Sequence, residues 1–511
     1  MTDPAGLVLT NGRIHSLTEP DEIHEAIAIR DGEIIRVGSS YEINFLRGAT
    51  TDVLDLDGAV VLPGFIDAHT HLEQLGRRLV QADLSGTDDI ADAIDRLNEE
   101  RERTDSGWIC GYGYDETEWD ERRRLTMADL DQVSVDRPVV AFREDLHTGS
   151  LNSVAFDQFA NEFPEHDVHR ENGDPTGVVV EDALNVIHEA TTPDATAMRS
   201  LIEAARDRAH ELGITGVHDF VRNSTAPQVY RALDLADALN LRVRINYWSD
   251  HLDALIELGE RTNYGSEFVR TGAIKSFADG SFGGRTAKLS EPYEDGDTGQ
   301  WVTAPNELEG LIERADASGF QYAVHAIGDV AIETVLDRFE RTEDPAGARH
   351  RIEHAELLTA ELIDAIAQSG VVVSAQPNFL KWAREGGLYE DCLGVDRTAR
   401  TNQFRRLLDA GVVLAFGSDC MPMNPLFGVQ QAVTAPHERQ RLTVTEALRA
   451  YTTGGAHAGF AADRLGTIKA GKRADLVVLN GSPWDVPVEV IADIGVTHTI
   501  VDGNVVFERE R

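Results

Sequence analysis

The sequence is poor in cysteine and has no long apolar run, and each scarcity excludes a class of protein. Its 511 residues include three cysteines, Cys110, Cys392 and Cys420, whose wide separation argues against a disulfide framework or a zinc knuckle. No apolar run reaches the roughly 18 residues that a membrane-spanning helix needs, and the N-terminus lacks the basic and apolar regions of a secretory signal. We therefore expect a soluble, cytoplasmic protein that does not bind membranes.

Lysine is also scarce, and basic charge as a whole is low. Five of the 47 basic residues are lysines, and the 88 acidic residues give a formal net charge of -41. Such a field repels phosphate backbones, so we expect no binding to nucleic acid. An acidic, lysine-poor surface stays hydrated at molar salt, where the Debye length falls to about 3 Å. The composition therefore predicts a salt-adapted, halophilic source.

Both ends of the chain carry strand and hairpin patterns. The segments GLVLTNGRIHSL and IAIRDGEIIRVG have Asn-Gly or Asp-Gly pairs between apolar alternations, and VTHTIVDGNVVFERE repeats the pattern near the C-terminus. Such pairs are the strongest short-range signal for a β-hairpin. We therefore predict a small β-sandwich domain formed by residues 1–60 together with residues 460–511.

The middle of the chain alternates between apolar segments and helical patterns. Segments that suit buried parallel strands are residues 60–66, 214–220, 241–248, 272–278, 320–325, 350–354, 371–376 and 412–418. Most are followed by a helical pattern, such as AIETVLDRFE after the fifth and LTAELIDAIAQSG after the sixth. Eight such repeats predict an α/β fold, a (β/α)8 TIM barrel over residues 61–459.

One connection in this pattern is far too long for a barrel crossover. About 140 residues, roughly 73 to 213, separate the first two predicted strands. Active sites of TIM barrels lie at the C-terminal ends of the strands, so an insertion there is placed to cover the site. We predict a lid subdomain over residues 75–195.

The most informative string is VLPGFIDAHTHLE, residues 61–73. It places His69 and His71 at alternate positions where an apolar run ends. Alternate residues of a strand project to one face, so both imidazoles can reach one metal ion. For an isolated pair of this kind, two surface histidines after a buried strand are the alternative.

This string resembles the opening signature of the amidohydrolase superfamily, metal-dependent hydrolases built on a TIM barrel. Other segments are similar to its YtcJ-like branch, also called the amidohydrolase-3 group, which includes N-substituted formamide deformylases. These segments include GYGYDETEW (111–119), HTGSLNS (147–153), IKSFADGSFGGRTAKLSEPY (274–293), VHAIGD (324–329), RIEHAE (351–356) and SAQPNF (374–379). The resemblance also implies a β-sandwich formed by both termini, and a homodimer.

The resemblance assigns further metal ligands at the strand ends. It implies a site for one or two divalent ions, for which we expect Zn²⁺, bound by His69, His71, Lys275, His325, His354 and Asp419. A buried lysine most often forms an ion pair, but burial also exposes a nucleophilic amine that captures carbon dioxide. We interpret Lys275 as a carbamylated, metal-bridging ligand.

The ligand set predicts hydrolysis of a carbon-nitrogen bond other than a peptide bond, in an amide, N-formyl or N-acyl compound. Metal lowers the pKa of bound water to about 7, and the resulting hydroxide attacks a small-molecule substrate. Asp419 acts as general base and then returns the proton to the leaving nitrogen. The alternatives are lactonase, isomerase or deaminase chemistry on the same scaffold, or a non-catalytic protein, although none of the expected ligands is missing.

Substrate contacts are less well specified by the sequence. Arg285 could clamp a carboxylate or pair with a local acid, and the family pattern suggests that His147 reaches the site. Asp219, Gln376 and Asn378 could line the pocket or bond to backbone at the strand ends.

Overall fold

The computed structural model describes residues 3–104, 107–117, 119–144, 148–294 and 296–509. The chain divides into two compact units, one formed by residues 1–71 and 206–511 and the other by residues 72–205. In the described ranges, no helix is both long and apolar enough to cross a membrane.

The larger unit contains an eight-stranded parallel sheet, counted over the described residues, whose neighbours follow the order of the chain. Its strands are β8 (Phe65–Thr70), β15 (Ile214–Val221), β16 (Arg242–Trp248), β17 (Val269–Phe277), β18 (Tyr322–Ala326), β19 (Arg351–His354), β20 (Val372–Ala375) and β21 (Leu414–Phe416). These strands lie at or close to the segments predicted from apolar patterning. They confirm the α/β, TIM-like fold.

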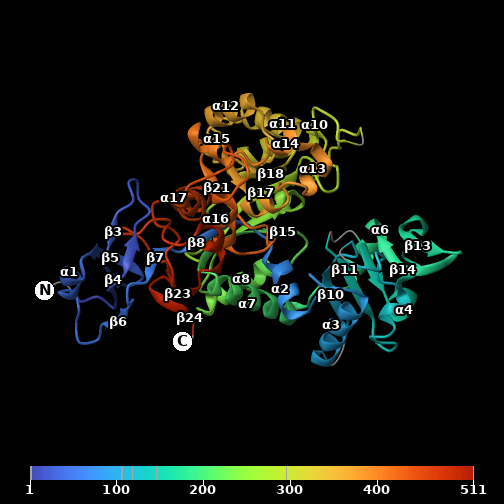
Figure 1. Cartoon of the computed structure of the whole chain (residues 1–511), viewed down its shortest axis with the longest axis horizontal. Coiled ribbons are helices and arrows are strands. Elements are labelled where there is room, and N and C mark those ends of the chain that lie inside the picture. Colours follow the sequence, from blue (N-terminus) through green and yellow to red (C-terminus); the bar gives the residue numbers. More distant parts are fainter. Residues whose placement is uncertain (1–2, 105–106, 118, 145–147, 295, 510–511) are drawn as a thin grey trace. The chain divides into compact units, whose positions relative to one another are not determined.

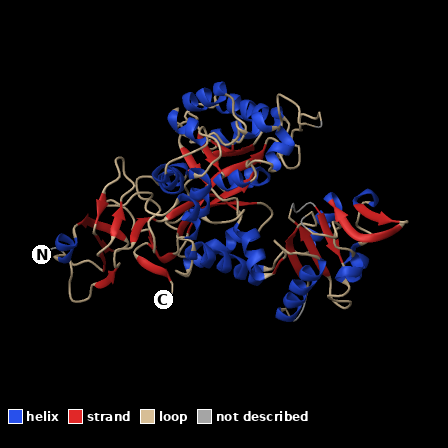
Figure 2. Ribbon diagram, viewed as in Figure 1, coloured by secondary structure: helices blue, strands red, loops and turns tan. Residues whose placement is uncertain are grey.

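Helices lie on the outside of the barrel strands (Figure 2). The helices between and after the barrel strands along the chain are α7 (Ala195–Glu211), which spans the boundary of the two units, α8 (Ala226–Leu235), α9 (Leu252–Glu257), α10 (Pro305–Ala317), α11 (Asp329–Phe339), α12 (Ala360–Ser369), α13 (Leu388–Leu393), α14 (Val395–Thr398), α15 (Phe404–Asp409), α16 (Pro425–Val433), α17 (Val444–Arg449) and α18 (Gly455–Ala458). The two helices predicted after the fifth and sixth strands are α11 and α12. Thr359 caps α12 by accepting from the N–H of Leu362.

The last barrel strand returns to the first. The N–H of Ser418 donates to Asp67 Oδ1 at 2.8 Å, and the N–H of Asp419 donates to the carbonyl of His69 at 2.8 Å. A Cβ on Gly417 would lie 2.4 Å from the backbone nitrogen of His69, so glycine is required for this approach. The closure places Asp419 beside the histidine pair.

The prediction that residues 60–66 form one barrel strand is wrong. The structure divides the run at Gly64 into β7 (Val60–Pro63), which pairs antiparallel with β22 (Leu476–Leu479), and the barrel strand β8. The N–H of Gly64 donates to the carbonyl of Asp475 at 2.8 Å. Because Val60–Pro63 and Phe65–Thr70 are buried throughout, hydrophobicity alone could not separate them.

Strands from both termini form two further sheets of the larger unit (Figure 1). One has the order β5-β4-β1-β6, from Glu33–Gly38, Ala26–Arg30, Leu7–Thr10 and Asp52–Asp55. The other has the order β24-β23-β22-β7-β2-β3, with β24 at Asn504–Glu508, β23 at Val496–Val501, β2 at Arg13–His15 and β3 at Ile23–His24. Leu9 and Ile27 of the first sheet share a buried cluster with Val61 and Leu476 of the second.

Two of the three predicted hairpins are confirmed. β4 and β5 turn at Asp31-Gly32, and β23 and β24 turn at Asp502-Gly503. The hairpin predicted at Asn11-Gly12 is wrong, because β1 and β2 belong to different sheets. Asn11 has a φ of 57°, and the chain crosses there from one sheet to the other, which leaves Leu9 and Ile14 in the same core.

Residues 72–205 form a unit with its own sheet, whose described strands have the order β13-β14-β12-β11-β10-β9. The strands are Val168–Glu171, Asp174–Val180, Thr148–Leu151, Val139–Arg143, Ile109–Tyr114 and Ala82–Asp83, and the helices are α2 (Leu72–Val80), α3 (Ile90–Arg103), α4 (Met127–Leu130), α5 (Ser153–Phe159) and α6 (Glu181–Ala190). Val139 and Ala141 of β11 enter one buried cluster, whereas Val140 and Phe142 enter another. Both faces of this sheet are therefore covered, and the expectation that the unit acts as a lid stays a prediction.

Candidate metal centre

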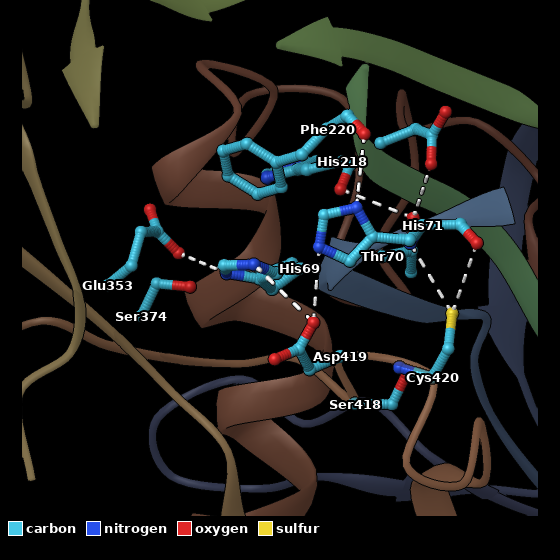
Figure 3. Close-up of polar contacts among 12 residues, drawn as sticks. His69, Thr70, His71, His218, Phe220, Glu353, Ser374, Ser418, Asp419 and Cys420 are labelled. Atoms are coloured by element: carbon cyan, nitrogen blue, oxygen red, sulfur yellow. Dashed lines mark hydrogen bonds and ion pairs between the residues drawn. The ribbon is translucent and has the colours of Figure 1, made fainter. Parts of the chain in front are cut away.

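Three predicted ligands converge at the C-terminal end of the barrel. His69 ends β8 together with Thr70, His71 follows that strand, and Asp419 follows β21. Asp419 Oδ1 lies 3.2 Å from His71 Nε2 and 3.8 Å from His69 Nε2. Figure 3 shows both rings directed at this carboxylate. One ligand atom from each residue lies within 4.8 Å of the others.

The other ring nitrogen of each histidine is held by the protein. His69 Nδ1 donates to Glu353 Oε2 at 2.7 Å, and His71 Nδ1 donates to the carbonyl of Phe220 at 3.1 Å (Figure 3). These bonds place the Nδ1 protons, so the lone pair of each Nε2 faces Asp419. When both imidazoles are neutral, two Nε2 lone pairs and a carboxylate oxygen therefore converge on one position. A divalent cation satisfies such a donor set, and two imidazoles with one carboxylate suit zinc and similar ions.

The electrostatic environment differs among the three residues. Burial lowers the pKa of His69 well below its ordinary value, with Lys275 adding to the effect, so its imidazole is neutral. Burial alone would raise the pKa of Asp419, but His69 and His71 outweigh it and hold the pKa below the usual range. Burial opposes a proton on His71, yet its bond to Asp419 raises the pKa above normal.

His325 and His354 lie next to the same cluster. Their ring centroids are 4.4 Å apart, and the His354 ring is 5.0 Å from that of His69. His325 Nε2 donates to the carbonyl of Gly280 at 2.9 Å, which leaves its Nδ1 lone pair available. Burial lowers the pKa of both histidines well below the ordinary value, so both are neutral, as ligation requires.

Unusual backbone conformations aim two of these residues. His354 has a φ of 72° and Asp419 a φ of 52°, and each is followed by another left-handed residue. Neighbouring residues of a regular strand point to opposite faces. Glu353 and His354 nevertheless both lie against His69, because the left-handed turn brings the second side chain back to the barrel axis. Such non-glycine conformations cost roughly 1–2 kcal/mol each and are typical of functional sites.

Lys275 lies near the end of β17 among buried residues. Its side chain is almost completely buried, and Nζ has no hydrogen-bond partner among the described residues. The nitrogen lies 4.5 Å from the centre of the Phe220 ring and 5.1 Å from that of Phe277. Burial lowers the pKa of this amine to about 8, although Glu353 and Asp419 act in the opposite direction. A neutral amine is therefore easier to reach here than in an exposed lysine.

The structure places the predicted substrate residues in different settings. Tyr230 donates to Asp219 at 2.7 Å, and Asn378 donates to the carbonyl of Pro422 at 2.7 Å, so both bond within the protein at the strand ends. Gln376 is buried beside His354. Arg285 lies half-buried in the loop after β17, and His147 lies outside the described residues. Their roles as substrate contacts stay predictions.

Sequence reasoning missed two buried charged residues of β19. Arg351 and Glu353 lie inside the barrel and are 1% and 0% exposed. The string RIEH carried the signal, because two opposite charges alternate along a strand that is otherwise apolar. Alternation puts both on one face but puts His354 on the other, so the pattern alone could not place the two charges inside the barrel.

Comparison with known proteins gives the same picture. Residues 52–507 match the amidohydrolase family. The chain is 32% identical over 524 residues to the putative amidohydrolase YtcJ of Bacillus subtilis (strain 168), covering 98% of each chain. It is 29% identical over 553 residues to the N-substituted formamide deformylase of Arthrobacter pascens, covering 100% of this chain and 99% of that protein.

A solved structure matches nearly the whole fold. It is an uncharacterized metal-dependent hydrolase from Pyrococcus furiosus, with a TM-score of 0.81 and 30% identity over 93% of this chain and 99% of that one. The chain therefore belongs to the amidohydrolase family, within it to the YtcJ-like branch, and is a hydrolase.

Proposed function

We propose that the protein hydrolyses a carbon-nitrogen bond other than a peptide bond, in an N-formyl, N-acyl or related amide. The observation that carries the proposal is the convergence of two imidazole Nε2 atoms on the carboxylate of Asp419. This arrangement joins a metal-binding donor set to a group that can carry a proton. The deformylase relative supports an N-formyl compound as the first substrate class to test.

The residues fit one or two divalent ions, and we propose zinc. His69, His71 and Asp419 would hold one ion, and His325 and His354 a second, with Lys275 as the carbamylated bridge. When bound, the metal supplies Lewis acidity that polarises a carbonyl and acidifies water. Metal binding requires neutral imidazoles, and burial lowers the pKa of His69, His325 and His354 in that direction.

Asp419 moves the proton in this proposal. Its carboxylate accepts a proton from the attacking water and then donates it to the amide nitrogen as the C–N bond breaks. Amide nitrogen is a poor leaving group until it is protonated, so a carboxylate at this position suits amides better than esters.

Product analysis tests the proposal. Purified protein in molar KCl, supplied with zinc and bicarbonate, is incubated with N-formyl, N-acyl and cyclic amides, and release of amine, ammonia and acid is followed. We expect hydrolysis by the parent, loss of activity after chelation, and recovery when zinc is returned.

The same assay separates the alternatives. A parallel panel contains lactones and aminated nucleobases. Turnover of these compounds alone would replace amide hydrolysis by lactonase or deaminase chemistry. If the metal-loaded protein turns over none of the compounds, the result would favour the non-catalytic alternative.

A further inference from the structure

Beneath the candidate metal centre lies a buried chain of charged groups that the proposed reaction does not use. Glu353 connects Arg351 to His69, and all three side chains lie inside the barrel. Glu353 Oε2 accepts the Nδ1 proton of His69 at 2.7 Å, as Figure 3 shows. Glu353 itself has no place among the six predicted ligands.

Arg351 holds Glu353 from the other side. Arg351 Nε donates to Glu353 Oε1 at 2.7 Å, and Arg351 Nη2 donates to Glu353 Oε2 at 3.0 Å, which makes the pair bidentate. Bidentate pairs of this kind fix geometry as well as charge. An isolated charge at full burial is costly, and the paired charge of Arg351 offsets that cost for Glu353.

The remaining donors of Arg351 are used by neighbouring strands. Nη1 donates to His218 Nδ1 at 2.8 Å. Nη2 also donates to the carbonyl of Ala68 at 2.7 Å and to Ser374 Oγ at 2.9 Å. These partners come from β15, β8 and β20. The guanidinium is therefore fixed by three strands besides its own, and its bonds to Glu353 fix the position of that carboxylate.

We propose that Glu353, anchored by Arg351, is a positioning residue that sets the tautomer and orientation of His69 for metal binding. By holding the proton on Nδ1, its carboxylate leaves the Nε2 lone pair directed at the position facing Asp419. The negative charge of Glu353 also makes the imidazole of His69 a stronger metal ligand. This inference rests on the proposed metal centre but not on the identity of the substrate.

A structural role alone would predict a different result from a positioning role. Loss of a purely structural carboxylate lowers the melting temperature and leaves the metal affinity of the folded protein intact. Loss of a positioning carboxylate weakens metal binding by about 10- to 100-fold even where the fold persists. Metal affinity therefore separates the two roles.

Glu356 offers a matched control three residues further along the chain. It is also buried, and it accepts hydrogen bonds from Tyr389 and Asn402 instead of from a histidine. Glu356→Gln replaces a buried carboxylate by an amide without touching the bond to His69. The comparison of Glu353→Gln with Glu356→Gln thus isolates the contact with the imidazole.

The experiment measures zinc affinity by competition with a chromophoric chelator and records the visible absorption of cobalt-loaded protein. Melting temperatures of the metal-free proteins report folding. We expect Glu353→Gln to lose about 10- to 100-fold in zinc affinity and to alter the cobalt spectrum. Glu356→Gln should match the parent in both. Glu353→Asp keeps the charge on a shorter side chain and should fall in between, which provides a test if Glu353→Gln does not fold.

Two results would overturn the inference. One is parental zinc affinity in both folded Glu353 variants, and the other is an equal loss in Glu353→Gln and Glu356→Gln. A parent that binds no metal would overturn the proposed metal centre itself, which differs from a parent that binds metal but hydrolyses no amide.

Discussion

Asp419 Oδ1 lies 3.2 Å from His71 Nε2, and the two residues follow the last and the first strand of the barrel. The contact exists because the barrel closes there, with the N–H of Asp419 bonded to the carbonyl of His69. The carboxylate of Asp419 thereby meets two imidazoles that are far from it in the sequence.

Asp419→Asn should remove the proton carrier and keep much of the shape of the site. We expect kcat on the best amide substrate to fall by about 10²–10⁴-fold, the range for a general acid-base group. Steady-state kinetics with saturating zinc measure the effect. Asp364→Asn, on the exposed side of α12, is the control and should behave as the parent. Equal kcat in Asp419→Asn and parent would exclude Asp419 from proton transfer.

Lys275 should bind carbon dioxide. Its Nζ lone pair attacks the carbon of CO₂ and loses one proton, which gives a carbamate with one negative charge. We expect a carbamate carbonyl signal in ¹³C NMR spectra of metal-loaded protein supplied with ¹³C-bicarbonate. The signal should vanish in Lys275→Ala and persist in Lys469→Ala, which changes an exposed lysine. A signal that survives in Lys275→Ala would assign the carbamate elsewhere.

His210 should make the stability of the larger unit depend on pH. It is 4% exposed, its Nε2 donates to the carbonyl of Asn240 at 2.8 Å, and burial lowers its pKa to about 4. The unfolded chain, with a histidine pKa near 6.5, takes up the proton first as the pH falls. The contribution of His210 is therefore complete above about pH 6.5 and is lost as the pH falls toward 4.

His210→Gln keeps a donor but cannot titrate. Its free energy of unfolding should depend less on pH between about 4.5 and 6.5, by up to about 1.4 kcal/mol per pH unit. Melting temperatures at pH 5 and pH 7.5 in constant KCl measure this difference. His166→Gln, at a histidine whose side chain is 80% exposed, should retain the parental pH dependence. The same pH dependence in His210→Gln would refute the assignment.

Salt should stabilise the protein. With a formal net charge of -41, the folded state repels itself, and raising KCl from 0.1 M to 2 M shortens the Debye length from about 10 Å to about 2–3 Å. We expect the melting temperature to rise by several degrees. Sucrose, which stabilises without screening, serves as the reference. A melting temperature that falls or stays constant in KCl would contradict the proposed salt adaptation.

Much of the barrel could be predicted because each strand is a short apolar run between helical patterns. The division of residues 60–66 could not, since β7 and β8 are equally buried and serve two different sheets. The hairpin prediction at Asn11-Gly12 was wrong for a related reason. A hairpin pattern specifies a change of direction, but the partners of β1 and β2 come from distant parts of the chain.

The residues of the candidate site could also be predicted only in part from the sequence. Alternation predicted that His69 and His71 share a target, and the resemblance supplied Lys275, His325, His354 and Asp419. The RIEH string gave no indication that Glu353 would meet His69, because that bond needs β8 and β19 on opposite sides of one closed barrel.

The sequence by itself determined the composition of the site and the local conformations, because apolar periodicity and turn chemistry act between near neighbours. Only the tertiary structure decided which nitrogen of each histidine faces Asp419. That choice depends on acceptors such as Glu353 and the Phe220 carbonyl, which other strands bring into hydrogen-bond distance when the barrel closes.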